Sequence, residues 1–371
     1  MRKRHLSIWL FAGFCLFLFS CTTRNNGETY NTDEITYRVG TSKELGEEVD
    51  SIRYLPLLKS DQHLVSEATK LRVKNNRIVI FEKKTHRVVS YDTNGHFLYE
   101  INHRGKGNKE YLEIANITVT ANYIYLLDNF KHKLNVYDIK DGSFVRSTDV
   151  PFVAWDLEAF DDNNLLFTML ESNPNGKVEA NGHNYAVWRT DSLGKIIDSY
   201  LPYEKGYYEM IGKEVYFTVS GDNIIFHSFM KDGYYTLDSK GILKYTNMNF
   251  NHPIPRGTPI AYDDVAKEKY QYLSTTPYVT DDYVLTEIGK GNLSEIQLYN
   301  NKEKTFLQNS DESCVNAMVD VSGIWGQQFV SFIPDIETYK DLVSCGFKKA
   351  DQTTEDCLNK GGQCLVIYRM K

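Results

Sequence analysis

The chain has 371 residues, and its 42 Lys and Arg against 49 Asp and Glu give a formal net charge of −7 at pH 7. This acidic balance argues against non-specific binding to nucleic acid, which requires a basic surface. Hydrophobic residues make up 42% of the chain and aromatic residues 13%, so a large core can be buried. Tyr, Phe, Val and Ile dominate the apolar runs and amphipathic helical patterns are scarce, which predicts an all-β fold.

The N-terminal residues are typical of an exported lipoprotein. Basic residues at positions 2–4 precede an apolar run over residues 6–19, which has the size of a signal-peptide core and is short for a membrane span. Residues 18–21 read Leu-Phe-Ser-Cys, which resembles the lipobox of bacterial lipoproteins, in which the cysteine, here Cys21, becomes the lipid-modified N-terminus. A cysteine without such a role is the alternative. We therefore predict a signal peptide over residues 1–20.

The polar stretch that begins at Cys21 predicts a flexible tether over residues 21–32, which leads to a folded body over residues 33–371. Residues 1–20 contain three basic and no acidic side chains, so the chain without them has a formal charge near −10. No acidic cluster follows Cys21 of the kind often seen in surface-exported lipoproteins. We expect a lipid anchor in the bacterial outer membrane with the body facing the periplasm, and exposure at the cell surface is the alternative.

A turn motif recurs along the chain and predicts the fold. Apolar runs end in small polar turns at residues 91–95, 137–142, 190–194, 237–241 and 299–302. Repeats spaced by roughly 40 to 60 residues, each with about four short strands, are typical of a β-propeller. The repeat therefore predicts an all-β, six-bladed β-propeller.

The predicted blades follow one another in chain order. They cover residues 68–101, 114–150, 154–201, 215–248, 272–307 and 315–370. The third blade carries a polar insertion over residues 171–184, a short helix is expected at residues 263–270, and the sixth blade holds a small helical insertion over residues 335–360. The sixth blade also lacks one strand, which the N-terminal run 51–57 can supply, so that the ring closes between the two chain ends.

Several motifs carry a resemblance to a known family. They are Ile-Arg-Tyr-Leu-Pro-Leu at residues 52–57, the Tyr-Asp-x-x-Gly turns, Gly-x-Gly followed by Glu-Tyr at residues 105–111, and Cys-Leu-Val-Ile-Tyr at residues 364–368. With them, residues 50–371 resemble the six-bladed β-propeller lipoproteins of Bacteroidetes, a group related in fold to NHL-repeat and TolB-type propellers. Asn and Lys replace the usual Pro-Gly at positions 108 and 109. The resemblance implies architecture and envelope location, and it implies no particular activity.

Basic residues gather in the connections of the first two predicted blades, on one face of the ring. This basic arc consists of Lys83, Lys84, His86, Arg87, His103, Arg104, Lys106, Lys109, Lys131, His132 and Lys133. It could bind an anionic glycan or an acidic protein, with Tyr111, Tyr207 and Tyr208 stacking on sugar rings. Solvated surface charge without a partner is the alternative.

The glycine-rich run 104–107 lies within this arc and matches neither a Walker motif nor a dinucleotide fingerprint. We interpret its glycines as allowing a tight connection between blades, with Glu110 pairing locally and Tyr111 packing at the blade junction. Nucleotide binding is therefore not expected.

The cysteines of the last blade are disulfide candidates in an oxidising compartment: Cys314, Cys345, Cys357 and Cys364. Four cysteines allow three complete pairings, and buried free thiols are the alternative. Zinc binding is not expected, because the chain has no Cys-x-x-Cys and no His after His252.

No serine-hydrolase, zinc-protease or sialidase motif occurs in the chain. The sequence therefore favours a lipid-anchored, non-catalytic binding or assembly module of the envelope, with no cofactor. The alternative is a divalent-cation-dependent hydrolase or lactonase, whose ligands, such as Glu82 and Asp128 at the ends of second strands, would face the central channel. Acidic residues at strand ends more often cap turns.

Overall fold

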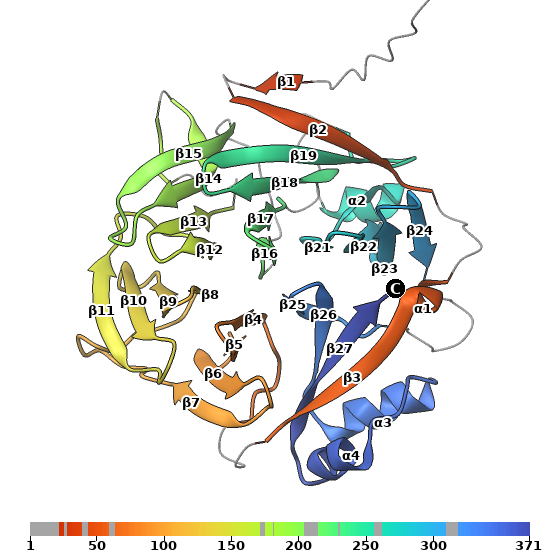
Figure 1. The fold of residues 1–371 in the computed structure, drawn as a ribbon. Helices are drawn as coiled ribbons and strands as arrows, with labels where there is room; N and C mark the ends of the chain where they lie inside the picture. Colours follow the sequence, from red (N-terminus) through yellow and green to blue (C-terminus); the bar gives the residue numbers. More distant parts are fainter. Residues whose placement is uncertain are drawn as a thin grey trace, which may run out of the picture.

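Six antiparallel sheets surround a central axis (Figure 1). This computed structural model describes residues 22–25, 28–38, 44–58, 64–170, 175–180, 182–203, 214–228, 231–255, 262–308 and 318–371. Each sheet is one blade, and β4, β8, β12, β16 and β25 are the strands of their sheets nearest the axis. The arrangement confirms the predicted six-bladed β-propeller.

The strands of each blade follow one another as a meander, except in the last blade. The first three blades are β4 (Lys70–Lys74), β5 (Arg77–Glu82), β6 (Arg87–Asp92), β7 (Phe97–Ile101); β8 (Asn116–Val119), β9 (Tyr123–Asp128), β10 (Lys133–Asp138), β11 (Phe144–Asp149); and β12 (Asp156–Asp161), β13 (Asn164–Thr168), β14 (Asn184–Thr190), β15 (Ile196–Tyr203). The next two are β16 (Phe217–Ser220), β17 (Asn223–Phe226), β18 (Gly233–Asp238), β19 (Gly241–Asn249); and β20 (Gln271–Leu273), β21 (Tyr278–Val279), β22 (Tyr283–Lys290), β23 (Leu293–Asn300), β24 (Thr305–Gln308).

The helices are few and short. They are α1 (Leu45–Glu48), α2 (Tyr262–Glu268), α3 (Ile336–Ser344) and α4 (Gln352–Asn359). α2 confirms the short helix predicted before the fifth blade, and α3 with α4 confirms the helical insertion of the sixth. Asp335 and Asp351 cap α3 and α4 by accepting hydrogen bonds from the backbone N–H groups three residues ahead. No described helix has the length and apolar character needed to cross a membrane.

The recurring turn motif closes the outer hairpin of the blades. In the first blade, the Asp92 carboxylate accepts hydrogen bonds from the backbone N–H groups of Asn94 at 2.9 Å and His96 at 2.8 Å, and Gly95 adopts a φ of +85°. Equivalent side-chain caps occur at Asp138, Asp191, Asp238 and Asn300. The repeat is therefore a turn requirement that recurs once in each of the first five blades.

An N-terminal strand closes the ring. The sixth blade consists of β25 (Val321–Trp325), β26 (Gln328–Ile333), β27 (Gln363–Met370) and β3 (Val49–Leu57), and β3 pairs antiparallel with β27. The backbone N–H of Leu58, just beyond β3, donates to the Gly95 carbonyl oxygen of the first blade at 2.7 Å. These contacts confirm the predicted closure by residues 51–57.

The segment ahead of β3 differs from the predicted tether. β1 (Thr22–Asn25) pairs with β2 (Glu28–Thr36), and β2 pairs in parallel with β19 along the outer edge of the fourth blade. Tyr37 is buried, and its ring contacts Phe250 and Phe306. The tether predicted for residues 21–32 therefore overlaps ordered strands, because an unpaired β19 edge offers backbone partners to this segment. Cys21 lies outside the described residues.

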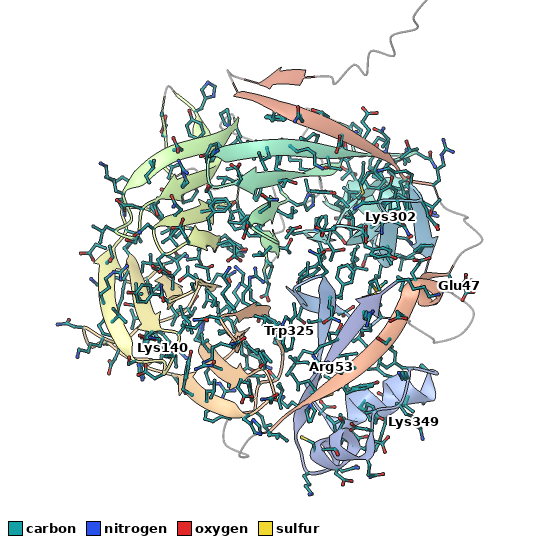
Figure 2. The ribbon with its side chains drawn as sticks, in the orientation of Figure 1. Glu47, Arg53, Lys140, Lys302, Trp325 and Lys349 are labelled. Carbon is teal, nitrogen blue, oxygen red and sulfur yellow. The ribbon has the colours of Figure 1, made fainter. Side chains whose placement is uncertain are left out.

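Side chains fill the space between neighbouring sheets (Figure 2). Leu55 and Leu57 of the closing strand pack with Leu71 and other apolar residues of the first blade. Trp325 lies near the axis, and the Arg53 guanidinium is 5.4 Å from the centre of its ring. The closing strand thus contributes both to the outer edge and to the packing beneath it.

We predict that deleting residues 30–58 destabilises the whole ring, because the sixth blade would lose its fourth strand and expose an edge to pairing with other molecules. Thermal melting and size-exclusion chromatography should show loss of the cooperative transition or oligomer formation. Deletion of residues 22–25 removes only β1 and serves as the control. An unchanged melting curve and monomeric elution for the longer deletion would contradict the role of closure.

Candidate binding face

One face of the ring carries the longer connections. In each antiparallel blade, the turn between second and third strands lies at the same end as the connection to the next blade. We call this the loop face. The opposite face carries the short hairpins that hold the recurring turn motif.

The predicted basic arc lies on the loop face and divides into two groups. The exposed members are Lys84, His103, Arg104, Lys106, Lys109 and His132. The half-buried members are Lys83, His86, Arg87, Lys131 and Lys133. Members of the half-buried group make internal contacts, and the side chains of the exposed group are the more accessible to solvent.

Arg87 illustrates the half-buried group. Its guanidinium lies 2.7 Å from a carboxylate oxygen of Glu82 and 3.5 Å from one of Glu100. Lys83 extends over the Trp155 ring, with its nitrogen 5.2 Å from the ring centre, and lies 3.5 Å from Glu214. The positive charges of both side chains are therefore balanced within the protein.

Lys131 shapes the connection between the first two blades. Its ammonium donates to the carbonyl oxygens of Gly105 at 3.0 Å, Gly107 at 2.9 Å and Glu110 at 2.7 Å, which uses all three of its donors. The Glu110 carboxylate accepts a 2.7 Å hydrogen bond from the Gly107 N–H. The predicted local pairing of Glu110 is confirmed, and Lys131 is a structural residue of this loop.

His86 and His132 occupy equivalent turn positions in the first two blades. Both have left-handed backbones, with φ of 55° and 52°. Histidine is one of the residue types that tolerates this region better than most. The Nδ1 atom of His86 also lies 3.2 Å from the backbone nitrogen of Ile114. Turn geometry therefore accounts for the recurrence of histidine at this position.

Tyr111 cannot stack on a sugar ring, because its side chain is fully buried. Its hydroxyl donates to the His86 carbonyl oxygen at 2.7 Å and accepts from the His103 N–H at 3.2 Å. The predicted packing at the blade junction is confirmed, and the stacking role is wrong. Tyr207 and Tyr208 lie outside the described residues.

Glu82 and Asp128 hold turns and do not serve the channel. Glu82 accepts hydrogen bonds from the backbone and hydroxyl of Ser66 at 2.5 and 2.6 Å. Asp128 accepts from the N–H groups of Leu112 at 2.7 Å and Lys131 at 3.0 Å. In both blades, an acid at the end of the second strand ties the incoming connection to the adjacent turn. Their prediction as channel-facing metal ligands is wrong, and the turn-capping alternative holds.

A charged network that the sequence did not predict joins the innermost strands of the first four blades. The fully buried Lys70 ammonium donates to the Asp156 carboxylate at 2.8 Å and to the carbonyl oxygens of Ile117 at 2.9 Å and Leu157 at 2.7 Å. These partners belong to the innermost strands of the second and third blades. Lys70 therefore links the first blade to the second and third.

A second ion pair lies two residues further along β4 and β12. Arg72 Nε donates to the Glu158 carboxylate at 2.9 Å, and an Arg72 amino group donates to the Phe217 carbonyl oxygen at 3.1 Å. Thr118 donates to the other carboxylate oxygen of Glu158. Burial opposes ionisation of Glu158, but the nearby Arg72 and Lys70 outweigh it and hold its pKa below the usual value.

The network leaves little capacity for an added ligand. The second oxygen of Asp156 accepts from the N–H groups of Tyr216 at 2.7 Å and Phe217 at 3.0 Å. Among the described residues, no group of three or more His, Cys, Asp or Glu side chains is arranged to hold a metal ion. A sequence signal did exist: Lys-x-Arg at residues 70–72 and Asp-x-Glu at residues 156–158 place opposite charges on innermost strands.

The cysteines lie around the helical insertion. Cys364 is buried in β27 and Cys357 is half-buried on α4, and both are free thiols. Burial, with a contribution from Cys357, raises the pKa of the Cys364 thiol to about 12. Cys345 ends α3. Cys314 lies outside the described residues, so the predicted disulfides remain a prediction.

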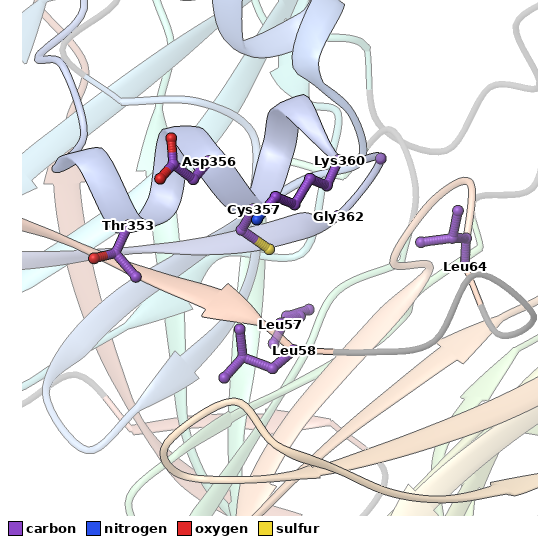
Figure 3. A pocket seen from close by; sticks show the side chains of 9 residues that line it. Leu57, Leu58, Leu64, Thr353, Asp356, Cys357, Lys360 and Gly362 are labelled. Carbon is purple, nitrogen blue, oxygen red and sulfur yellow. The ribbon is translucent and has the colours of Figure 1, made fainter.

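A cavity of about 550 Å³ lies beside α4 (Figure 3). Cys357 points from the helix towards Leu57 and Leu58 on the floor, while Asp356 and Lys360 supply its polar side. It is a partly apolar space at the junction of the helical insertion with the closing strand. The predicted basic arc contributes nothing to its lining.

Comparisons with known proteins support the fold. Residues 34–346 match the model of the family described as Domain of unknown function (DUF4934). A Bacteroides fragilis protein inferred to be exported is 19% identical, with a TM-score of 0.74 over 92% of this chain and 99% of that chain. A member of the DUF4221 family from Bacteroides vulgatus is 12% identical, with a TM-score of 0.50 over 87% and 97%. A search of the curated proteins gives no match.

We predict that Glu158→Ala lowers the free energy of unfolding by about 3–5 kcal/mol, because it leaves Arg72 buried without its counter-charge. Asp149→Ala is the control: it removes an exposed partner of Lys133 and should cost about 0–1 kcal/mol. Urea unfolding measures both. Equal losses for the two variants would contradict a stabilising role for the axial network.

The lowered pKa of Glu82 predicts that acid destabilises the fold. Burial opposes its ionisation, but hydrogen bonds from Ser66, Thr85 and Arg87 outweigh it and lower its pKa from 4.5 to about 2. Ionised Glu82 therefore stabilises the fold fully above pH 4.5, and this contribution is lost as the pH falls towards 2. The stability advantage of wild type over Glu82→Gln, measured by urea unfolding, should shrink below pH 4.5. A stability advantage over Glu82→Gln that stays constant down to pH 3 would contradict this role of Glu82. The same pH trend for Glu337→Gln, at an exposed position of α3, would also contradict it.

Proposed function

We propose a function from the buried contacts and exposed residues of the chain itself, because the family to which it belongs is described only as Domain of unknown function (DUF4934). It is a non-catalytic binding or assembly module of the bacterial envelope, anchored in the outer membrane by a lipid on Cys21 and facing the periplasm. It uses no cofactor, and its partner is not a nucleic acid. The partner meets the loop face.

The ion pairing of the acidic groups on the innermost strand of the third blade is the observation that carries this proposal. Asp156 and Glu158 on β12, the innermost strand of the third blade, are buried against Lys70 and Arg72. Binding a divalent cation there would require breaking these ion pairs and leaving buried cations uncompensated, which is costly. The geometry therefore favours recognition at the surface over hydrolysis in the channel.

The position of the N-terminal strands supports an anchored module. β2 runs along the outer rim of the fourth blade, so a lipid on Cys21 would hold the ring by this edge (Figure 1). The loop face would then stay accessible to a partner. The Bacteroides fragilis protein of similar fold is itself inferred to be exported, which agrees with an envelope location.

We predict that Cys21→Ala moves the protein from the membrane fraction to the soluble fraction while the propeller stays folded, because the lipid is the proposed attachment. Cys15→Ala is a matched control, since Cys15 lies within the predicted signal peptide. Fractionation after a high-salt wash, with labelled palmitate incorporation, measures the effect. Retention of the Cys21 variant in the membrane, or loss of label from the Cys15 variant, would contradict lipid anchoring at Cys21.

A further inference from the structure

The exposed members of the basic arc form a patch on the rim of the first two blades. Lys84 and Lys106 are exposed, and neither enters a salt bridge within the part of the chain that the structure describes. Lys109 is also exposed, and its nitrogen lies 6.0 Å from the centre of the Phe144 ring. The patch is thus positive on a protein whose overall balance is acidic.

An aromatic side chain lies among these cations. Phe130 is 68% exposed at the tip of the turn between β9 and β10. The neighbouring Lys131 binds the carbonyl oxygens of Gly105, Gly107 and Glu110, so this turn is held against the connection that carries Lys106 and Lys109. The backbone that carries the two lysines therefore lies beside the Phe130 turn, and the Lys109 ammonium extends from it towards Phe144 of β11.

The residue types of the patch favour an acidic polysaccharide over an acidic protein as its partner. Interfaces between proteins are depleted of lysine and need an apolar core, whereas this patch has several lysines and one exposed aromatic ring. An acidic polysaccharide fits better. Its carboxylates can pair with ammonium groups, and the C–H face of a sugar ring can pack on Phe130.

The location of the patch argues against a membrane as its partner. β2 lies on the rim of the fourth blade, and the first blade lies across the ring from it (Figure 1). A membrane that holds the N-terminus would therefore face the opposite rim. The patch is directed towards partners away from that membrane.

We propose that Phe130 with Lys106 and Lys109 forms a binding site for a uronic-acid polysaccharide. The site rests on the proposed binding function, and the exclusion of a membrane as its partner rests on the proposed lipid attachment at Cys21. Arg104 and His132 extend it along the rim. Attraction between exposed charges is screened within about 8 Å at physiological salt, so binding weakens as salt rises.

The test is binding of the chain from residue 22, which contains every described residue, to immobilised polygalacturonate. We expect Lys106→Glu with Lys109→Glu to weaken binding at least about tenfold, and Phe130→Ser to weaken it at low and high salt alike. Lys106→Arg with Lys109→Arg should bind as wild type does. The matched control is Lys195→Glu with Lys240→Glu, on exposed turns of the opposite face in the third and fourth blades, which should leave binding unchanged.

The remaining outcomes distinguish failure of the polysaccharide site from failure of the proposed binding module. No binding of wild type to polygalacturonate, or equal weakening by the control pair, overturns the polysaccharide site. Binding to phosphatidylglycerol vesicles that is lost with Lys106→Glu and Lys109→Glu, without polygalacturonate binding, overturns it in favour of a membrane surface. In either case the binding module itself stands if the native protein still co-isolates with another envelope component, and it fails if no component does.

Discussion

The ring depends on one pairing between the two ends of the chain. β3 and β27 are far apart in sequence, yet they are adjacent strands of the sixth blade. Without β3, the sheet would end at β27 and the first and last blades would share fewer contacts. Closed rings protect strand edges that would otherwise pair with other molecules. β2 pairs with the outer strand of the fourth blade, and Tyr37 packs among apolar residues of the fourth and fifth blades. The N-terminal segment therefore links these two blades as well.

The axial network imposes a second constraint, on where function can reside. Lys70 and Arg72 reach from the first blade to the third, and both pairs are buried. A buried ion pair is stable only when its hydrogen-bonding groups are satisfied, and here backbone groups of the second and fourth blades complete the set. This arrangement ties the inner strands together, and it uses the acidic groups that a metal site would need.

Local chemistry explains which parts of the fold were predictable. The Asp92 turn and its equivalents need a side-chain acceptor and, in several blades, a residue with positive φ, so the same letters recur in each blade. The helical insertion and the closing strand followed from counting strands against this repeat. The contacts of Lys70 were not predictable in the same way, because its partners lie in other blades and are brought together only by the closed ring.

The sequence predicted which connections carry the basic residues, but it could not predict which of these residues are exposed. The sequence places many cations in the connections of two blades, but exposure depends on which of them find acceptors nearby. Arg87 meets Glu82, and Lys131 meets three carbonyl oxygens, so both become part of the scaffold. The same contacts brace the loop that presents Lys106 and Phe130. The half-buried cations thus hold the connections from which the exposed ones project, and a substitution of Lys131 would disturb the 105–110 loop as well as the fold.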